Sequence, residues 1–361
     1  MKIAIIGTRG IPNNYGGFEQ FAQYLSLDLV KHGFDVWVYN SHNHPHKEKI
    51  WNGVNIIHCY DPEDTIGTVG QFIYDFNCIR DCRKRGFDII LQLGYTSNSI
   101  WHRMLPKIPK IVTNMDGLEW KRTKYSPMVR RFLMYAEKLA VISSDVLIAD
   151  SKPIQEHLQS KYKRESVFIP YGTFQFENPD ITILSKYGVE AGKYFMCIAR
   201  MQSDNHIEEI IKGVNMSRST YPLLIFGSTK NRYGKKLRKK YSSQTIRFME
   251  SEYDIEILNN LRYFCYGYFH GHSAGGTNPS LLEAMASYSM ICAHNNVFNK
   301  SVLEKNAIYF DTPQDIASHI NNDRFTIDKE KFVNKNYLKT RELYNHQNIS
   351  KKYINTFETI V

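Results

Sequence analysis

Apolar runs and amphipathic segments alternate from the beginning of the chain. Residues 3–6 form a continuous apolar run that Gly7 closes, and a polar loop then reaches Gly17. Apolar residues recur at helical spacing from there until Gly33, and a second apolar run occupies residues 34–40. The order of strand, glycine-rich loop, helix and strand is typical of a parallel sheet with crossover helices.

The same alternation continues to about residue 170 and then starts again with a buried strand at residues 193–200 and a helix at residues 206–217. Other predicted strands lie at residues 54–60, 87–94, 110–115, 145–150 and 166–172, and then at 221–228, 245–250, 262–269 and 290–295. Two such series predict an α/β protein with two Rossmann-like, doubly wound domains that face each other across a cleft. Ligands would bind at the carboxyl ends of the strands.

The expected domain boundary lies near residues 170–173. It gives an N-terminal domain of residues 1–170 and a C-terminal domain of residues 171–361, each large enough to bury its own core. From Lys329 onward the chain is polar and rich in lysine and asparagine, and it ends in an amphipathic stretch. We expect this end to be helical, and its last helix could pack back on the N-terminal domain.

Charge and cysteine content indicate which binding partners and which cellular compartment to expect. The net charge of +10 favours contact with something anionic, such as nucleic acid, a membrane surface or a phosphorylated ligand. The six cysteines form no CxxC pair, which favours a reducing compartment with buried thiols. The first apolar run is too short for a signal peptide, and no later run reaches membrane-spanning length. We therefore expect a cytoplasmic protein, at most lying on the inner face of the plasma membrane.

The first loop carries two adjacent glycines, Gly16 and Gly17, at the start of a predicted helix. Backbone N–H groups and the helix dipole could receive a phosphate or sugar there. Only Gly7 and Gly10 fit the GxGxxG spacing, so a nicotinamide-dinucleotide site is poorly supported. The alternative is a turn that merely needs positive φ at both glycines. Binding is favoured because two adjacent glycines exceed what one turn requires.

Two carboxylates, Asp116 and Glu119, follow the predicted strand at residues 110–115. At that edge of the sheet they could accept hydrogen bonds from sugar hydroxyls or take a proton. The alternatives are a helix-capping Asp116 and a surface Glu119.

Arg200 closes the first strand of the second series. A guanidinium fixed at a strand end can pair with a diphosphate and neutralise the charge that develops as it leaves. A structural salt bridge is the alternative.

The stretch GGTNPSLLEA begins at Gly275 and combines flexible backbone with a helix start. Asn278 is suited to cap the helix and Pro279 to begin it, with Leu281, Leu282 and Met285 as the buried stripe. Gly275 and Gly276 let a ligand approach the backbone, toward which the N–H groups of Thr277 and Asn278 would point. Glu283 lies beyond the first turn, so the helix dipole does not explain it, whereas a ribose diol would.

Two histidines precede this stretch. His270 and His272 have metal-like spacing, but no convincing third ligand and no DxD sequence accompanies them. No metal and no cofactor is therefore expected, and His272 is counted among the candidate substrate-binding residues.

Basic residues mix with aromatic ones at residues 101–131 and, more densely, at residues 230–241. The second cluster falls on a predicted helix, for which a solvated face, nucleic acid and an anionic lipid are competing interpretations. No nucleic-acid motif accompanies it, so an anionic membrane surface or a phosphorylated lipid carrier is favoured, and no nucleic-acid partner is expected.

These motifs together resemble the retaining glycosyltransferases of family 4. The similar segments are GGFE in the first loop, DVLIADS, FIPYGT, CIAR followed by HIEEII, and GGTNPSLLEAMA, which span most of the chain. The combination of GTRGIP, NMDGLEWKR and GGTNPSLLEAMA looks most like the subgroup that includes bacterial capsule and O-antigen rhamnosyltransferases. The resemblance implies the GT-B fold.

Three family positions differ in this chain. The first glutamate of the family's Glu-x7-Glu pair falls on Gly275, and only the second, Glu283, is kept. The lysine that usually follows the arginine falls on Asn205, and a histidine often found in the acceptor-side loop falls on Met115. Ribose binding therefore carries over better than the contact with the donor sugar, and more weight falls on Asp116.

The resemblance implies a metal-independent transfer of a sugar from a nucleotide-diphosphate donor to a lipid-linked oligosaccharide in surface polysaccharide synthesis. The C-terminal domain would hold the donor through Glu283, Arg200 and the amides of Thr277 and Asn278, while the first loop and Asp116 would face the acceptor. L-rhamnose is one candidate sugar. A nucleotide-sugar epimerase of the same fold and a non-catalytic, basic nucleic-acid-binding protein remain as alternatives.

Overall fold

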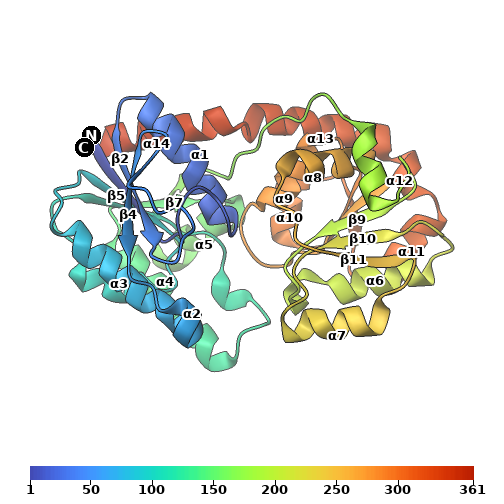
Figure 1. Ribbon diagram of the computed structural model, residues 1–361, viewed down its shortest axis with the longest axis horizontal. Helices are drawn as coiled ribbons and strands as arrows, with labels where there is room; N and C mark the ends of the chain where they lie inside the picture. The colour runs from blue at the N-terminus through green and yellow to red at the C-terminus, as the bar shows by residue number, and fades with distance from the viewer. The chain divides into compact units, whose positions relative to one another are not determined.

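The computed structural model describes residues 1–361, and the chain forms two compact units (Figure 1). Unit 1 comprises Met1–Trp120, Ser126–Tyr171 and Gln347–Val361. Unit 2 comprises Lys121–Tyr125 and Gly172–His346. The chain therefore passes from one unit to the other four times, and unit 1 takes up both ends of the sequence.

Unit 1 contains an eight-stranded sheet in the order β3-β4-β2-β1-β5-β6-β7-β8. All neighbouring strands are parallel except the short β3, which pairs antiparallel with β4. The strands are β1 (Lys2–Ile6), β2 (Asp35–Ser41), β3 (Ile50–Trp51), β4 (Val54–Cys59), β5 (Ile89–Leu93), β6 (Lys110–Asn114), β7 (Val146–Ala149) and β8 (Val167–Phe168). The apolar runs of the sequence predict every one of these strands except β3.

Helices cover both faces of this sheet, with α3 on one face and α1 and α14 on the other (Figure 1). The side chain of Asn114 donates to the hydroxyl of Tyr353 on α14 at 3.0 Å, and the Phe21 ring of α1 lies 5.3 Å from that of Tyr353. The helices are α1 (Gly17–Lys31), α2 (Glu63–Ile66), α3 (Gly70–Cys82), α4 (Pro127–Ser143), α5 (Lys152–Tyr162) and α14 (His346–Ile360), with short 3-10 turns η1 (Gly67–Val69), η2 (Ser99–Met104) and η3 (Glu119–Lys121).

Unit 2 contains a six-stranded, fully parallel sheet in the order β11-β10-β9-β12-β13-β14. Strand order reverses between β9 and β12, and the crevice at such a point is where ligands bind in open α/β sheets. The strands are β9 (Phe195–Ile198), β10 (Leu223–Phe226), β11 (Ile246–Met249), β12 (Gly267–His270), β13 (Ile291–His294) and β14 (Ile308–Phe310).

The prediction of one strand over residues 262–269 is wrong, because its first three residues end helix α8 and the strand begins only at Gly267. Asp254 caps this helix by accepting from the N–H groups of Glu256 and Ile257, so the helix starts early and uses residues up to Phe264. The helices of unit 2 are α6 (Ile207–Met216), α7 (Arg232–Tyr241), α8 (Ile255–Phe264), α9 (Pro279–Ala286), α10 (Val297–Leu303), α11 (Pro313–Asn321), α12 (Arg324–Ile327) and α13 (Lys329–Leu343), with 3-10 turns η4 (Ile181–Tyr187) and η5 (Ser203–Asn205).

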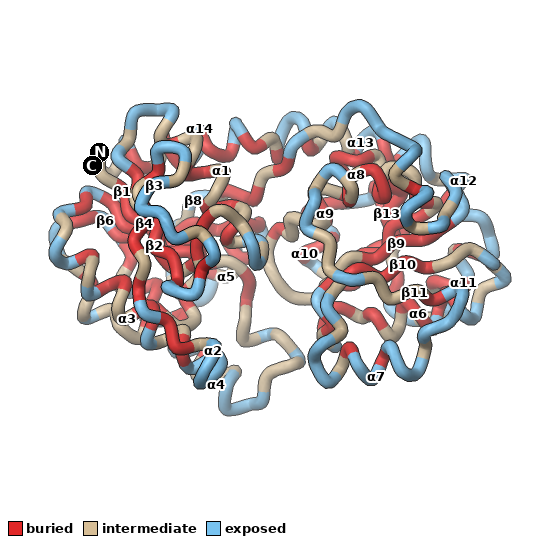
Figure 2. The backbone as a smooth tube through the Cα atoms, viewed as in Figure 1, coloured by how far each residue is buried: buried red, intermediate tan, exposed pale blue.

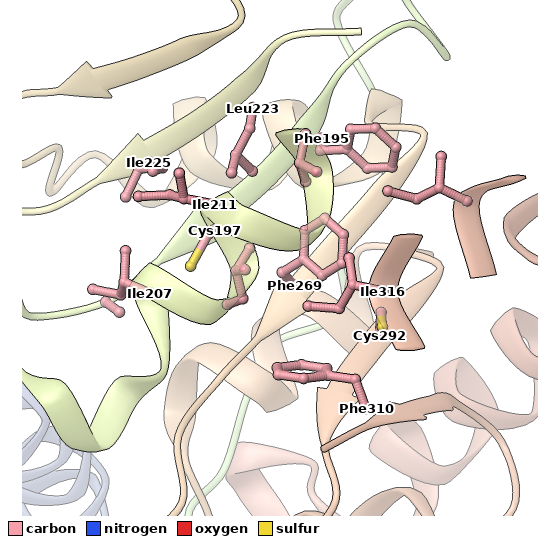
Figure 3. Close-up of a cluster of buried hydrophobic side chains, with 14 of the residues drawn as sticks. Phe195, Cys197, Ile207, Ile211, Leu223, Ile225, Phe269, Cys292, Phe310 and Ile316 are labelled. Carbon is pink, nitrogen blue, oxygen red and sulfur yellow. The ribbon is translucent and has the colours of Figure 1, made fainter. Parts of the chain in front are cut away.

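Both sheets are buried along their strands, as parallel strands covered on two faces must be (Figure 2). In unit 2, Phe195 and Cys197 of β9 and Leu223 and Ile225 of β10 point to one face and meet Ile211 of α6 (Figure 3). This packing fixes the ends of β9 and β12, from which the loops described below emerge. None of the helices is both long enough and apolar enough to cross a bilayer.

A buried carboxylate in unit 1 fixes the chain just before it leaves for unit 2. Glu137 of α4 accepts from His157, Lys161, Tyr162 and Trp120 at 2.7–3.0 Å. Burial alone would raise the pKa of Glu137, but these donors outweigh it and lower the pKa to about 2. Trp120 is thereby held at the residue where the chain passes into unit 2.

Candidate active site

The loops that follow β9 and β12 bring together the candidate residues of unit 2. β9 and β12 are parallel neighbours, so both loops leave the same edge of the sheet. The β9 loop carries Arg200, which is exposed, and the β12 loop carries His272, which is half-buried. The backbones are joined where the N–H of Ser273 donates to the carbonyl of Asp204 at 3.1 Å. The two loops therefore form one surface.

This surface carries the positive charges of two arginines, which act on His272. Burial, together with the positive charges of Arg200 and Arg122 and the ring of His206, lowers the pKa of His272 to about 3. His272 is therefore neutral at physiological pH. Its Nδ1 atom is buried without a hydrogen-bond partner. A neutral imidazole beside two arginines can orient an anionic ligand, whereas the charge that attracts the ligand comes from the arginines.

Arg122 reaches this surface from the short segment 121–125 that belongs to unit 2. Its Nη1 atom lies 3.1 Å from Oδ2 of Asp204, whose side chain is 1% exposed. Lys124 from the same segment donates to Gln202 at 3.2 Å. The salt bridge of this loop is thus made by Arg122, and the Arg200 guanidinium stays at the surface.

The helix start at Asn278 has the predicted local geometry. The Asn278 side chain accepts from the N–H of Ser280 at 3.0 Å, Pro279 is the first residue of α9, and Leu281, Leu282 and Met285 are buried. Gly276 and Asn278 are half-buried and Thr277 is buried.

Gly275 is constrained by its backbone, not by crowding. Its φ is +135°, a backbone angle that residues other than glycine rarely adopt. A Cβ added there would meet no atom within 4 Å. The space beside Gly275 is open, so backbone conformation alone disfavours a glutamate at this position.

Glu283 has a protein partner that the sequence does not indicate. Its Oε2 atom accepts from Nη2 of Arg262 at 2.5 Å, and the Arg262 side chain is 1% exposed. Nη1 of Arg262 donates to Asn259 at 2.7 Å, while Nε is buried without a partner. Glu283 therefore neutralises a buried guanidinium, which is a sufficient structural reason for a carboxylate at this point of α9.

Two histidines with lowered pKa values should make unit 2 sensitive to acid. Burial lowers the pKa of both His270 and His272, whose rings stack with centroids 4.5 Å apart. The unfolded chain then binds these protons more readily, so stability is full above pH 6.5 and falls as the pH drops below it.

Between pH 7.5 and 5.5 we expect these two histidines to cost unit 2 roughly 2–3 kcal/mol of unfolding free energy. Urea unfolding at several pH values, followed by hydrogen exchange of unit 2 peptides, measures it. The His272→Asn variant should lose about half of the pH dependence that these two histidines contribute. Stability that stays constant or rises over that interval would contradict the prediction.

In unit 1, the two glycines of the first loop do not occupy a positive-φ turn, so that alternative interpretation is wrong. Gly16 has φ −171° and caps α1 without a side chain, and Gly17 is the first residue of the helix. The nearby Glu19 is buried and accepts from the N–H of Arg9 at 2.8 Å and from the hydroxyl of Thr8 at 3.2 Å. The Glu19 carboxylate therefore fixes the loop at Thr8 and Arg9. The two glycines lie where helix α1 begins.

Tyr171 connects this loop with Asp116. Its ring lies 6.5 Å from that of Phe18 and 5.4 Å from that of Phe21, and its hydroxyl donates to Oδ1 of Asp116 at 3.4 Å. Burial and the negative charge of Asp116 raise the pKa of Tyr171, so it remains a neutral donor. Tyr171 thus contacts both Asp116 and the first turns of α1, the helix that begins at Gly17.

Asp116 does not cap an α-helix, because the next one, α4, is capped by Ser126. Asp116 has φ +47°, a left-handed conformation that aspartate tolerates, and its N–H donates to Asn114 at 2.9 Å. Glu119 is half-buried and begins the 3-10 turn η3. The left-handed backbone at Asp116 and its contact with Tyr171 set it apart from an ordinary surface carboxylate.

No group of three or more His, Cys, Asp and Glu side chains is arranged to hold a metal ion. His270 and His272 stack on each other instead of converging on a point.

Four residues of these surroundings were not singled out from the sequence: Arg122, Asp204, Arg262 and Tyr171. Arg122 lies within the quoted segment NMDGLEWKR, so a signal existed, but nothing in its spacing indicated a partner 82 residues away. Arg262 was hidden inside a wrongly predicted strand, where a buried arginine has no evident purpose.

Comparison with known proteins shows which families and folds the chain resembles. Residues 1–174, just under half of the chain, match the model of a domain of unknown function (DUF1972). No curated protein matches the sequence.

The whole chain superposes on solved structures at low identity. Sucrose-phosphate synthase from Thermosynechococcus elongatus matches with a TM-score of 0.80 and 14% identity, over 99% of this chain and 98% of that one. The Anabaena protein HepE in complex with UDP and glucose matches with a TM-score of 0.77 and 15% identity over 100% of both chains. The α,α-trehalose 6-phosphate synthase from Burkholderia multivorans matches with a TM-score of 0.70 and 11% identity, over 100% and 98%.

The chain has the GT-B fold. At these identities the likeness establishes the architecture of two parallel-sheet, Rossmann-like units over almost the whole length. Within a GT-B protein, the surface after β9 and β12 lies at the strand ends where α/β sheets bind ligands.

Proposed function

We propose that the protein is a retaining, metal-independent glycosyltransferase that uses a nucleoside-diphosphate sugar as donor. The observation that carries the proposal is the surface at the β9 and β12 strand ends, where the positive charges of Arg200 and Arg122 act on a neutral His272. A sugar diphosphate carries the opposite charge and would meet this surface beside the capped start of α9. Among the structural neighbours, HepE from Anabaena binds UDP and glucose.

In the proposed reaction the bond between the sugar and the diphosphate breaks while the acceptor oxygen forms a bond on the same face. Negative charge then grows on the leaving diphosphate, and Arg200 would stabilise it, with Arg122 adding to the positive field. The amides of Thr277 and Asn278 and the open space beside Gly275 would receive phosphate and sugar. The departing phosphate itself would take the proton of the acceptor hydroxyl.

The finer assignments follow the resemblance to family 4. Residues 171–361 would hold the donor, with Glu283 on the ribose. Residues 1–170 would receive a lipid-linked oligosaccharide near Gly16, Gly17, Asp116 and Glu119. The resemblance to capsule and O-antigen enzymes makes L-rhamnose the first sugar to test. The open space beside Gly275 suits a donor with fewer hydroxyl groups to bind, such as a deoxy sugar.

A panel of nucleotide sugars tests the donor site directly. We expect dTDP-rhamnose, or a UDP-hexose in second place, to stabilise the protein by about 2.7 kcal/mol at a hundred times its dissociation constant. Thermal unfolding with each ligand measures this, and free rhamnose and the nucleoside without phosphate serve as controls. If none of the nucleotide sugars stabilises the protein, the donor-site assignment fails.

Analysis of the products separates transfer from its alternatives. Incubation with the stabilising donor and a lipid-linked acceptor should lengthen the acceptor by one sugar and release the nucleoside diphosphate. An isomerised donor without any diphosphate release would instead indicate an epimerase.

A further inference from the structure

Helix α4 of unit 1 presents an outward face that combines large apolar and basic side chains. Met128, Tyr135 and Ile142 are 78%, 56% and 62% exposed and are spaced seven residues apart. Arg131 and Lys138 lie between them and are also exposed. At 100° per residue these five positions fall within about 80° of the helix circumference, so they form one stripe. We call these five residues the α4 stripe.

The α4 stripe is not needed for the fold. The helix packs on unit 1 through its opposite face, where Leu133, Ala136, Leu139 and Ala140 are buried. Large apolar residues that recur on the solvent side of one helix differ from the single exposed apolar residues of ordinary surfaces. The regular spacing therefore calls for a partner.

The charge of the α4 stripe has one sign. The helix contains a single acidic residue, Glu137, which is buried and accepts from His157, Lys161, Tyr162 and Trp120. No acidic side chain of α4 is therefore left to balance Arg131 and Lys138. Such a surface is complementary to a partner that has a negatively charged outer layer and an apolar interior beneath it.

We infer that α4 docks in the plane of an anionic lipid bilayer. Met128, Tyr135 and Ile142 would enter the boundary between headgroups and acyl chains, while Arg131 and Lys138 pair with lipid phosphates. A second copy of the chain fits less well, because a symmetric contact would bring the same cations together. A nucleic acid would satisfy the cations but leave the apolar side chains in water.

The other basic helix, α7, lacks this combination. Its exposed positions carry lysine and arginine, whereas Leu237 is buried and Tyr233 and Tyr241 pack against the core. Its cations also have acidic neighbours, since Lys240 lies 3.0 Å from Glu208. The charge of α7 is therefore a solvated face without an apolar anchor, and α4 is the docking surface.

Vesicle sedimentation of the full chain tests this inference without any sugar donor, so its outcome is independent of the proposed function. The probes are vesicles of phosphatidylcholine with about 40% phosphatidylglycerol, and vesicles of phosphatidylcholine alone. We expect the protein to partition at least tenfold more strongly onto the anionic vesicles, and 0.5 M salt should weaken binding by screening the charges.

Two variants and one matched control locate the surface. Met128→Ser, Tyr135→Ser and Ile142→Ser together should weaken partitioning at least tenfold, and Arg131→Gln with Lys138→Gln about fivefold per charge. Lys235→Gln with Lys239→Gln removes the same charge from α7 and should change partitioning less than twofold. All substituted side chains are exposed, and circular dichroism checks that each variant remains folded.

The inference is overturned if the protein does not sediment with anionic vesicles, or if the α7 variant loses vesicle binding while the α4 variants keep it. A concentration-dependent dimer that the α4 substitutions dissociate would assign the stripe to a second copy instead.

Discussion

Replacing Glu283 with alanine is expected to lower the free energy of unfolding of unit 2 by about 3 kcal/mol, because the Arg262 side chain, at 1% exposure, would lose its carboxylate partner. All four tryptophans, Trp37, Trp51, Trp101 and Trp120, belong to unit 1. Tryptophan fluorescence therefore follows unit 1 during urea unfolding, and a transition seen only by circular dichroism or by hydrogen exchange of unit 2 peptides reports on unit 2.

This result affects how a loss of activity in the Glu283→Ala variant is interpreted. A drop in donor binding could come from a missing ribose contact or from a damaged unit 2. The paired substitution Arg262→Met with Glu283→Leu removes both charges and should restore most of the stability, since apolar replacement of a buried pair is close to neutral. If Glu283 binds the ribose, the double variant should be stable and yet still fail to bind the donor.

Glu283→Gln is the conservative control, because its amide oxygen still accepts from Arg262. Donor binding that returns fully in the double variant would rule out a ribose contact. A Glu283→Ala variant as stable as the parent protein would contradict the structural role of the pair.

Replacing Arg200 with alanine is expected to reduce kcat by about 10²–10³-fold, the cost of removing one preorganised donor from developing negative charge. Arg200 is exposed at the end of β9, so its loss should not destabilise the fold. Steady-state kinetics with the identified donor measure the effect, and the thermal midpoint should stay within a few degrees.

Arg218→Ala is the matched control, because Arg218 is also exposed but follows the opposite end of α6. It should leave kcat within twofold of the parent protein. Arg200→Lys should recover only part of the rate, since an ammonium cannot pair bidentately with phosphate oxygens. An Arg200→Ala variant with unchanged kcat would remove this arginine from the mechanism.

The sequence predicts most of the fold because buried parallel strands are apolar runs and their crossover helices have a clear period. The two-residue strand β3 is too short to produce such a signal. The end of α8 was misassigned for a different reason. Residues 262–264 are as aromatic as a strand, and only the distant cap at Asp254 shows that they continue a helix.

The candidate site is predictable only where local sequence dictates local geometry. Asn278 and Pro279 act on the residues beside them, and the helix begins where the sequence indicates. The partners of Glu283 and Asp204 come from other elements, 21 and 82 residues away. Pairing over such separations depends on tertiary packing, so no spacing rule reveals it.

The way the chain divides between the units has a consequence for its synthesis. Unit 1 includes the first 120 residues but also Gln347–Val361, which follow the whole of unit 2. At about 5–20 residues per second, a ribosome needs roughly 10–35 s to make residues 172–346 after the first part of unit 1 has emerged. During that time the partners of Tyr353, among them Phe21 and Asn114, have no helix α14 to cover them. Although it is translated first, unit 1 completes its fold last.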